Sequence, residues 1–215
     1  IENKPYAVGG PLLTLLFWST CLVFLVALWL SPVLPFGDYN YHLSLGAILR
    51  RSASADSPER ALYATNLITY NGGFQIAVAI LGFIMPMELA SLVVFTGTWV
   101  GLCLVVIALL RALEQPTERA FIVFPLFLAM AFAWGFINYN MGLVLLLWAL
   151  SRAIRRPRVG ATISYDAITG FITMLGLLSH LMSTAIGFML IFITLVVRTM
   201  ADRRPIGISY LRTLR

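Results

Sequence analysis

The fold is decided by PLLTLLFWSTCLVFLVALWL, residues 11–30, a stretch that contains no charged residue. Twenty residues of α-helix rise about 30 Å, which is the thickness of the hydrocarbon core of a lipid bilayer. Pro32 and Pro35 follow this stretch and are expected to end the helix, because proline lacks the backbone N–H that a helix interior requires. Residues 11–30 therefore predict a membrane-spanning helix.

The composition extends this prediction to the whole chain. Of its 215 residues, 60% are hydrophobic and 11% are charged, against about 45–50% and about 25% in soluble proteins. No part of the sequence resembles a separate soluble domain. We therefore expect an all-α fold in which residues 1–215 form a single membrane domain.

Further uncharged runs predict a polytopic bundle of about six transmembrane helices. The expected spans are residues 11–30, 89–110, 120–137, 141–154, 165–180 and 183–199. Residues 138–140, Asn-Tyr-Asn, are expected to form a turn between two of these spans. The remaining long segment, residues 33–88, is expected to be an outer loop that carries interfacial helices.

Short helices are expected at several places in this loop. The apolar run at 43–49 precedes Arg50 and Arg51, as in a helix that lies on a membrane surface. Ser57 and Pro58 are typical first residues of another helix. The break at 71–73, Asn-Gly-Gly, favours a pair of interfacial or re-entrant helices over the alternative of one span across residues 69–88.

The basic residues support this count and give an orientation. With a cytoplasmic N-terminus, all but three of the 15 Lys and Arg residues fall on the inner side, the exceptions being Arg50, Arg51 and Arg60. This asymmetry is what the positive-inside rule predicts. Because the net charge of +6 is divided among short segments between apolar runs, nucleic acid is not an expected partner.

If the protein is an enzyme, its catalytic residues are expected in the first polar segment after residues 11–30, VLPFGDYNYHLSLGAILRR, residues 33–51. Asp38 and His42 are four residues apart, so on a helix they project from the same side. Asp38 could act as a general base toward a sugar hydroxyl, or hold a divalent metal ion, the one cofactor that the sequence suggests. The alternative is that Asp38 caps a helix and that His42 is an interfacial polar residue.

Other polar and sulfur-containing residues also stand in or beside apolar runs. His180 could meet the region of Asp38 if the bundle closes, as an acid, a ligand or a hydrogen-bond donor, or it could be an interfacial residue in the turn between two spans. Asp166 is expected to be structural, because a carboxylate in the first turn of a helix is favoured by the helix dipole. Cys21 and Cys103 are expected to be buried thiols.

Three segments resemble bacterial GT-C-type membrane glycosyltransferases. GDYNYHLSLGAILRR at 37–51 is similar to the first outer loop of that family, and GFINYNMGLVLLLWAL at 135–150 and LLSHLMSTAIGFMLIFI at 177–193 are similar to its later helices. The resemblance implies that Asp38 is the acidic catalytic or metal-binding residue, with His42 beside it. It also implies a polyprenyl-phosphate-linked sugar as substrate, transferred with inversion on the outer face of a bacterial inner membrane. The distribution of basic residues gives the expectation that both termini are cytoplasmic.

The family normally has more spans than this chain, which leaves a second hypothesis open. Small residues such as those of GTWVG at 97–101 allow close helix packing. The chain could therefore be a non-catalytic accessory subunit that packs against other membrane subunits and binds lipid or pigment. Membrane lipids are expected partners under both hypotheses.

Overall fold

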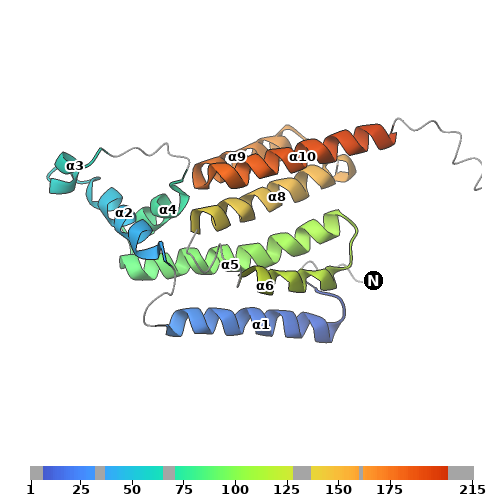
Figure 1. Cartoon of the computed structure of the whole chain (residues 1–215), viewed down its shortest axis with the longest axis horizontal. Helices are drawn as coiled ribbons and strands as arrows, with labels where there is room; N and C mark the ends of the chain where they lie inside the picture. Colours follow the sequence, from blue (N-terminus) through green and yellow to red (C-terminus); the bar gives the residue numbers. More distant parts are fainter. Residues whose placement is uncertain (1–6, 32–36, 65–70, 128–136, 160–161, 203–215) are drawn as a thin grey trace, which may run out of the picture.

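The computed structural model describes residues 7–31, 37–64, 71–127, 137–159 and 162–202, and all regular structure in these ranges is helical. The elements in chain order are α1 (Pro11–Leu30), α2 (Tyr39–Arg51), α3 (Pro58–Leu62), α4 (Gly73–Leu81), α5 (Met87–Ala112), the 3-10 helix η1 (Thr117–Ile122), α6 (Val123–Phe127), α8 (Ile137–Val159), α9 (Ile163–Ser179) and α10 (Leu181–Asp202). The axes of the long helices lie roughly parallel to one another in one bundle, and α2, α3 and α4 gather at one end of it (Figure 1).

Among the described residues, three helices are long and apolar enough to cross a membrane, namely Pro11–Leu30, Met87–Ala112 and Ile137–Arg156. The apolar parts of α9 and α10 are shorter. The expectation of an integral membrane protein with an all-α fold therefore agrees with the structure, whereas the count of about six spans is not confirmed. Half of the span expected at 120–137, residues 128–136, lies outside the described residues.

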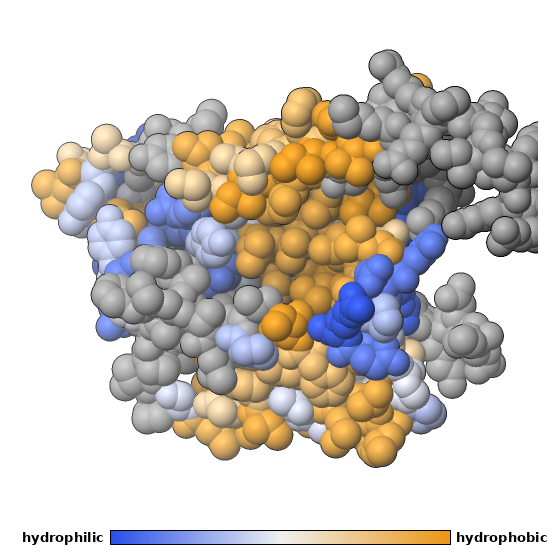
Figure 2. Space-filling view, turned by 45° about the vertical axis from the view of Figure 1, so that its right-hand side comes forward, coloured by the Kyte–Doolittle hydropathy of each residue, from blue (hydrophilic) through white to orange (hydrophobic). Residues whose placement is uncertain are grey.

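The surface of the bundle agrees with a lipid environment. Figure 2 shows a broad hydrophobic face with hydrophilic patches toward both ends. Large apolar side chains are exposed along α1 and α10, among them Leu15, Val23, Leu30, Phe188 and Phe192. In water such a surface would be costly, so we expect hydrocarbon chains to cover it.

The described part of residues 33–88 forms short helices, as predicted. Ser57 is the N-cap of α3, Pro58 is its first residue, and α4 begins at Gly73, the last residue of the predicted break. A single span over 69–88 is wrong, because α4 ends at Leu81 and a non-helical turn separates it from α5.

The Asn-Tyr-Asn segment is a correction to the prediction. Asn138, Tyr139 and Asn140 lie in the first turn of α8, a helix of 23 residues, rather than in a turn between two spans. The physical reason is tertiary: the Asn138 side chain forms hydrogen bonds with Phe74 and Gln75 on α4 and with the carbonyl of Asn71, two residues before α4 begins. A turn propensity read from the sequence cannot anticipate such partners.

The two larger of three apolar clusters among the described residues join most of the helices. The first joins α1 to α5 and α6 through Phe17, Trp99 and Phe124, and contains the buried free thiols of Cys21 and Cys103, whose Sγ atoms are 3.8 Å apart. The second cluster packs α2 and α4 onto α5 and α8, and its buried members are Leu28, Tyr39, Phe74, Val78, Ala90, Val94, Phe95 and Ile137. The second cluster therefore fixes the loop helices against the bundle.

At the opposite end of the bundle, α8 and α9 are joined by polar contacts. Arg156 Nε and Nη2 donate to the two carboxylate oxygens of Asp166, both at 2.8 Å. The Arg152 guanidinium lies 3.8 Å from the centre of the Tyr165 ring, and the Tyr165 hydroxyl donates to the Arg152 carbonyl. Asp166 lies in the first turn of α9, as predicted. We call this end, with Arg111, Arg119, Arg152, Arg155 and Arg156, the basic end.

The start of α4 touches the end of α9 so closely that a side chain has no room. The Gly72 N–H donates to the Leu178 carbonyl at 3.1 Å. A Cβ atom on Gly73 would lie 2.8 Å from Ser179 Cα and 2.9 Å from Ser179 Cβ, distances at which backbone has to move. Glycine is therefore required at the contact between these two helices.

We expect Gly73→Ala to lower the free energy of unfolding by about 1–3 kcal/mol, the usual effect of overpacking a close contact. Thermal or denaturant unfolding of the purified protein in mild detergent measures this. Gly170→Ala is the matched control, because a Cβ there meets nothing within 4 Å and alanine is the better helix former. Equal stability of the two variants would contradict the close contact.

Candidate functional site

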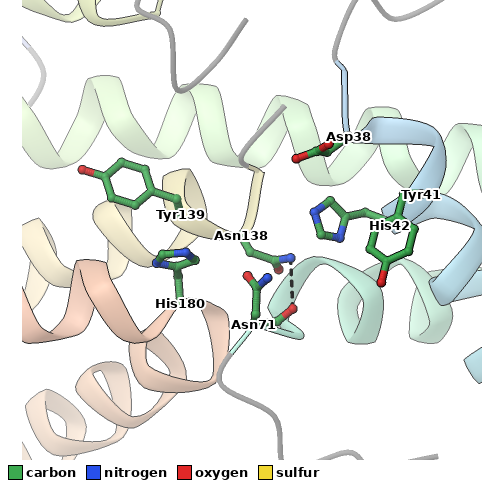
Figure 3. Close-up of a pocket in the computed structure, with 7 residues that line it drawn as sticks. All are labelled: Asp38, Tyr41, His42, Asn71, Asn138, Tyr139 and His180. Carbon is green, nitrogen blue, oxygen red and sulfur yellow. Dashed lines mark hydrogen bonds between the residues drawn. The ribbon is translucent and has the colours of Figure 1, made fainter. Parts of the chain in front are cut away.

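A polar pocket of about 280 Å³ opens at the end of the bundle where α2 and α4 lie, which we call the pocket end. It is lined by Asp38, Tyr41, His42, Asn71, Asn138, Tyr139 and His180. Figure 3 shows Asp38, Tyr41 and His42 from the α2 segment on one side, Tyr139 and His180 on the other, and Asn71 and Asn138 between them. The pocket thus collects polar residues from four separate segments of the chain.

One wall of the pocket is a buried chain of hydrogen bonds. Asn138 Oδ1 accepts from the Phe74 N–H at 2.7 Å, and its Nδ2 donates to the Asn71 carbonyl at 3.1 Å and to Gln75 Oε1 at 3.0 Å. Gln75 Nε2 in turn lies 2.7 Å from His42 Nδ1. Asn138, Gln75 and His42 are all buried, so the chain of bonds is shielded from competing water.

This chain of bonds sets the protonation state of His42. The Phe74 N–H can only donate, so Oδ1 of Asn138 must face it and Nδ2 must face Gln75 Oε1. The remaining amide group of Gln75 then donates to His42 Nδ1, which has to be the unprotonated nitrogen. His42 is therefore neutral and carries its proton on Nε2.

Burial acts on His42 in the same direction. Desolvation lowers the pKa of its imidazole below the ordinary value, and the nearby charge of Asp38 offsets part of this effect. Burial likewise lowers the pKa of His180. Among the described lining residues, Asp38 is the charged group that faces these two histidines.

We expect His42 to titrate below its ordinary pKa of about 6.5. The folded protein then binds fewer protons than the unfolded chain as the pH falls below that value, so the free energy of unfolding is highest above about pH 6.5 and decreases toward lower pH. Because the chain has two histidines, ¹⁵N-histidine NMR can follow each one and report the proton on Nε2 of His42. A His42 pKa above 6.5, or a proton on Nδ1, would contradict the assigned bonds.

Asp38 occupies the N-cap position of α2 but does not use its side chain as a cap. Its carbonyl accepts the His42 N–H at 3.1 Å, and no side-chain capping bond is formed. The carboxylate instead points into the pocket (Figure 3). The residue next to it, Tyr39, is anchored by a 2.6 Å hydrogen bond between its hydroxyl and Ser91 Oγ on α5, which fixes the start of α2.

His180 lies between α9 and α10 and serves the structure as well as the pocket. It is the C-cap of α9, and its Nδ1 accepts the Ser183 N–H at 3.4 Å in the first turn of α10. Its ring also meets the Tyr139 ring edge to face, with centroids 5.4 Å apart. The fold therefore brings His180 to the same pocket as Asp38 and His42, but on its opposite side.

The sequence did not predict the roles of Gln75 and Asn138 at this site. Gln75 is the bridge between His42 and Asn138, yet it stands in an apolar run with no motif around it. Asn138 was expected to be a turn residue. One signal was available in the sequence. Both amides have apolar neighbours, and a polar side chain in such surroundings is costly unless it has a hydrogen-bond partner.

A divalent ion would find few ligands in this pocket. Asp38 offers one carboxylate, whereas His42 Nδ1 is engaged by Gln75 and its Nε2 carries a proton. Within the part of the chain that the structure describes, no three His, Cys, Asp or Glu side chains are grouped so as to hold an ion. Asp38 is therefore the one carboxylate ligand among the described lining residues, and the metal binding expected at Asp38 stays a prediction.

Comparison with known proteins adds no assignment. The chain matches no known protein family, no curated protein and no solved structure at a significant level. The site therefore has to be interpreted from its own geometry.

Proposed function

We propose that the protein transfers a sugar from a polyprenyl-phosphate donor at the membrane surface, with Asp38 as the general base. The observation that carries the proposal is the shared pocket of Asp38, His42 and His180. These three residues come from the α2 segment and from the junction of α9 and α10, far apart in the sequence. The GT-C resemblance of the segments that contain them points to the same substrate class.

The lining of the pocket suits a sugar. Asn71 and Asn138 supply amides, and Tyr41 and Tyr139 supply ring faces together with hydroxyl groups. Ligand sites typically combine apolar surface with a few polar groups that fix orientation. At about 280 Å³ the pocket has room for a small polar group such as one sugar, while a polyprenyl chain would lie outside it in the lipid.

The proposed reaction is an inverting displacement. The Asp38 carboxylate takes the proton of an acceptor hydroxyl, whose oxygen then forms a bond to the anomeric carbon of the donor sugar. The bond from that carbon to the phosphate oxygen breaks, and polyprenyl phosphate leaves with the electron pair. Neutral His42 is placed to donate its Nε2–H to a sugar or phosphate oxygen. No step of this sequence uses a metal ion.

The ends of the bundle support an orientation for this reaction. Five arginines lie at the basic end, whereas Arg50, Arg51 and Arg60 lie on α2 and α3 at the pocket end, where Asp38 and both histidines also lie. By the positive-inside rule the basic end faces the cytoplasm. We propose that the pocket faces the exterior of a bacterial inner membrane and that both termini are cytoplasmic.

The test is purification of the native protein in mild detergent, followed by native mass spectrometry and reconstitution with a radiolabelled polyprenyl-phosphate hexose. We expect a species that carries polyprenyl-phosphate lipid and that consumes the labelled donor. Copurification with a stoichiometric set of other membrane proteins, together with no consumption of the donor, would overturn the proposal in favour of an accessory subunit.

A further inference from the structure

A second pocket lies away from the polar one, between the C-terminal halves of α2 and α4. It encloses about 300 Å³, and its walls include Leu49, Ile76, Ile80 and Phe83, with Arg50 and Ser52 at the α2 side. About eight helical residues, or roughly 12 Å, separate Arg50 from His42 along α2. We call this pocket the α2–α4 groove; the transfer reaction proposed above makes no use of it.

The apolar part of the groove continues onto exposed surface. Ile80 is 62% exposed and Phe83 is 64% exposed, and Ile84 beyond them is 78% exposed. These side chains belong to a short helix and turn next to the candidate spans, where lipid surrounds the protein. A hydrocarbon chain in the groove would therefore continue along an apolar surface.

The polar part of the groove is positively charged. Arg50 Nη1 donates to the Gly82 carbonyl at 2.8 Å, which lays the guanidinium across the end of α4. Its other N–H groups form no hydrogen bond or ion pair to the residues that the structure describes. Neighbouring Arg51 is instead neutralised by Glu59 at 3.0 Å. Glu59 is itself held ionised, because hydrogen bonds from Ser57 and Arg51 lower its pKa to about 2.

Ser52 adds a second polar group in need of a partner. Its hydroxyl is shielded from solvent and is unsatisfied within the described ranges of the chain. A buried hydroxyl without a hydrogen bond is unfavourable, and a ligand oxygen entering beside Arg50 would satisfy it.

We infer that the α2–α4 groove binds an anionic phospholipid, with its phosphate at Arg50 and Ser52 and part of one acyl chain along Ile76, Ile80 and Phe83. An amphiphile that carries a negative charge directly beside hydrocarbon matches both halves of the groove. Guanidinium groups pair well with phosphate oxygens, and basic residues at a membrane surface favour anionic lipids. The bound lipid would tie α2 and α4 to the bilayer surface.

The experiment is native mass spectrometry of the whole protein, titrated with dioleoyl phosphatidylglycerol or with dioleoyl phosphatidylcholine. The two lipids share their acyl chains and differ in headgroup charge. We expect the phosphatidylglycerol to bind at least about fivefold more tightly than the phosphatidylcholine. The Arg50→Gln variant should lose that preference. Arg60→Gln is the matched control, because Arg60 lies on α3 outside the groove.

A second variant keeps the inference testable if Arg50→Gln disturbs the end of α4. Ile80→Ser should weaken binding of both lipids and preserve their ratio, since it alters only the apolar wall. Equal affinity for the two lipids, or equal effects of Arg50→Gln and Arg60→Gln, would overturn the inference. The readout is lipid affinity and not sugar transfer, so this result is independent of the proposed function.

Discussion

Asp38→Asn is expected to abolish sugar transfer while leaving the fold intact. A positioned general base contributes about 10²–10⁴-fold to a rate, and an amide of the same shape cannot take up the proton. Because the Asp38 side chain forms no capping hydrogen bond, its replacement removes no bond that holds α2. Initial rates of consumption of a radiolabelled polyprenyl-phosphate hexose, compared with the unaltered protein, measure the loss.

Asp56→Asn is the matched control for this prediction. Asp56 is exposed in the connection between α2 and α3 and does not line the pocket. The same chemical change there should leave both the rate and the melting temperature unaltered. Unchanged transfer by Asp38→Asn would remove Asp38 from the reaction, and equal losses in both variants would trace the effect to altered net charge.

The helices were predictable where local chemistry alone decides them. An uncharged run of 20 residues followed by prolines gives α1, and a serine–proline pair gives the start of α3. Each of these signals depends on residues next to one another in the sequence. The number of spans could not be predicted in this way. Whether a short apolar helix such as α9 crosses the membrane or only enters it depends on the helices packed against it.

The three residues predicted for the site meet in one pocket, but the contacts that hold them could not be predicted from the sequence. Asp38, His42 and His180 stand out in the sequence because polar groups are rare beside apolar spans, and all three line one pocket. What orients His42 is Gln75, held in turn by Asn138, and these residues come from α4 and α8. Such partners are set by tertiary packing, which leaves no pattern in a single sequence.

Asn138→Ala is expected to cause the largest loss of stability of any change at the site. The substitution leaves the Phe74 N–H and Gln75 Oε1 without their partner in a place where Asn138 itself is 2% exposed. Each buried polar group left unpaired costs about 1–3 kcal/mol, so we expect a decrease of about 2–4 kcal/mol in the free energy of unfolding. Denaturant unfolding in mild detergent measures it.

Asn71→Ala separates the role of this network from that of the pocket lining. Asn138 bonds to the backbone carbonyl of Asn71, which alanine retains, so this variant should stay close to the unaltered protein in stability.

The two variants should also differ in the pKa of His42. Without Asn138, the Gln75 amide is free to turn its oxygen toward Nδ1, which stabilises the imidazolium and raises the pKa of His42. If ¹⁵N-histidine NMR found the same His42 pKa in both variants, the hydrogen bonds through Asn138 and Gln75 would be ruled out as the cause of the neutral state of His42. Burial alone would then have to account for that state.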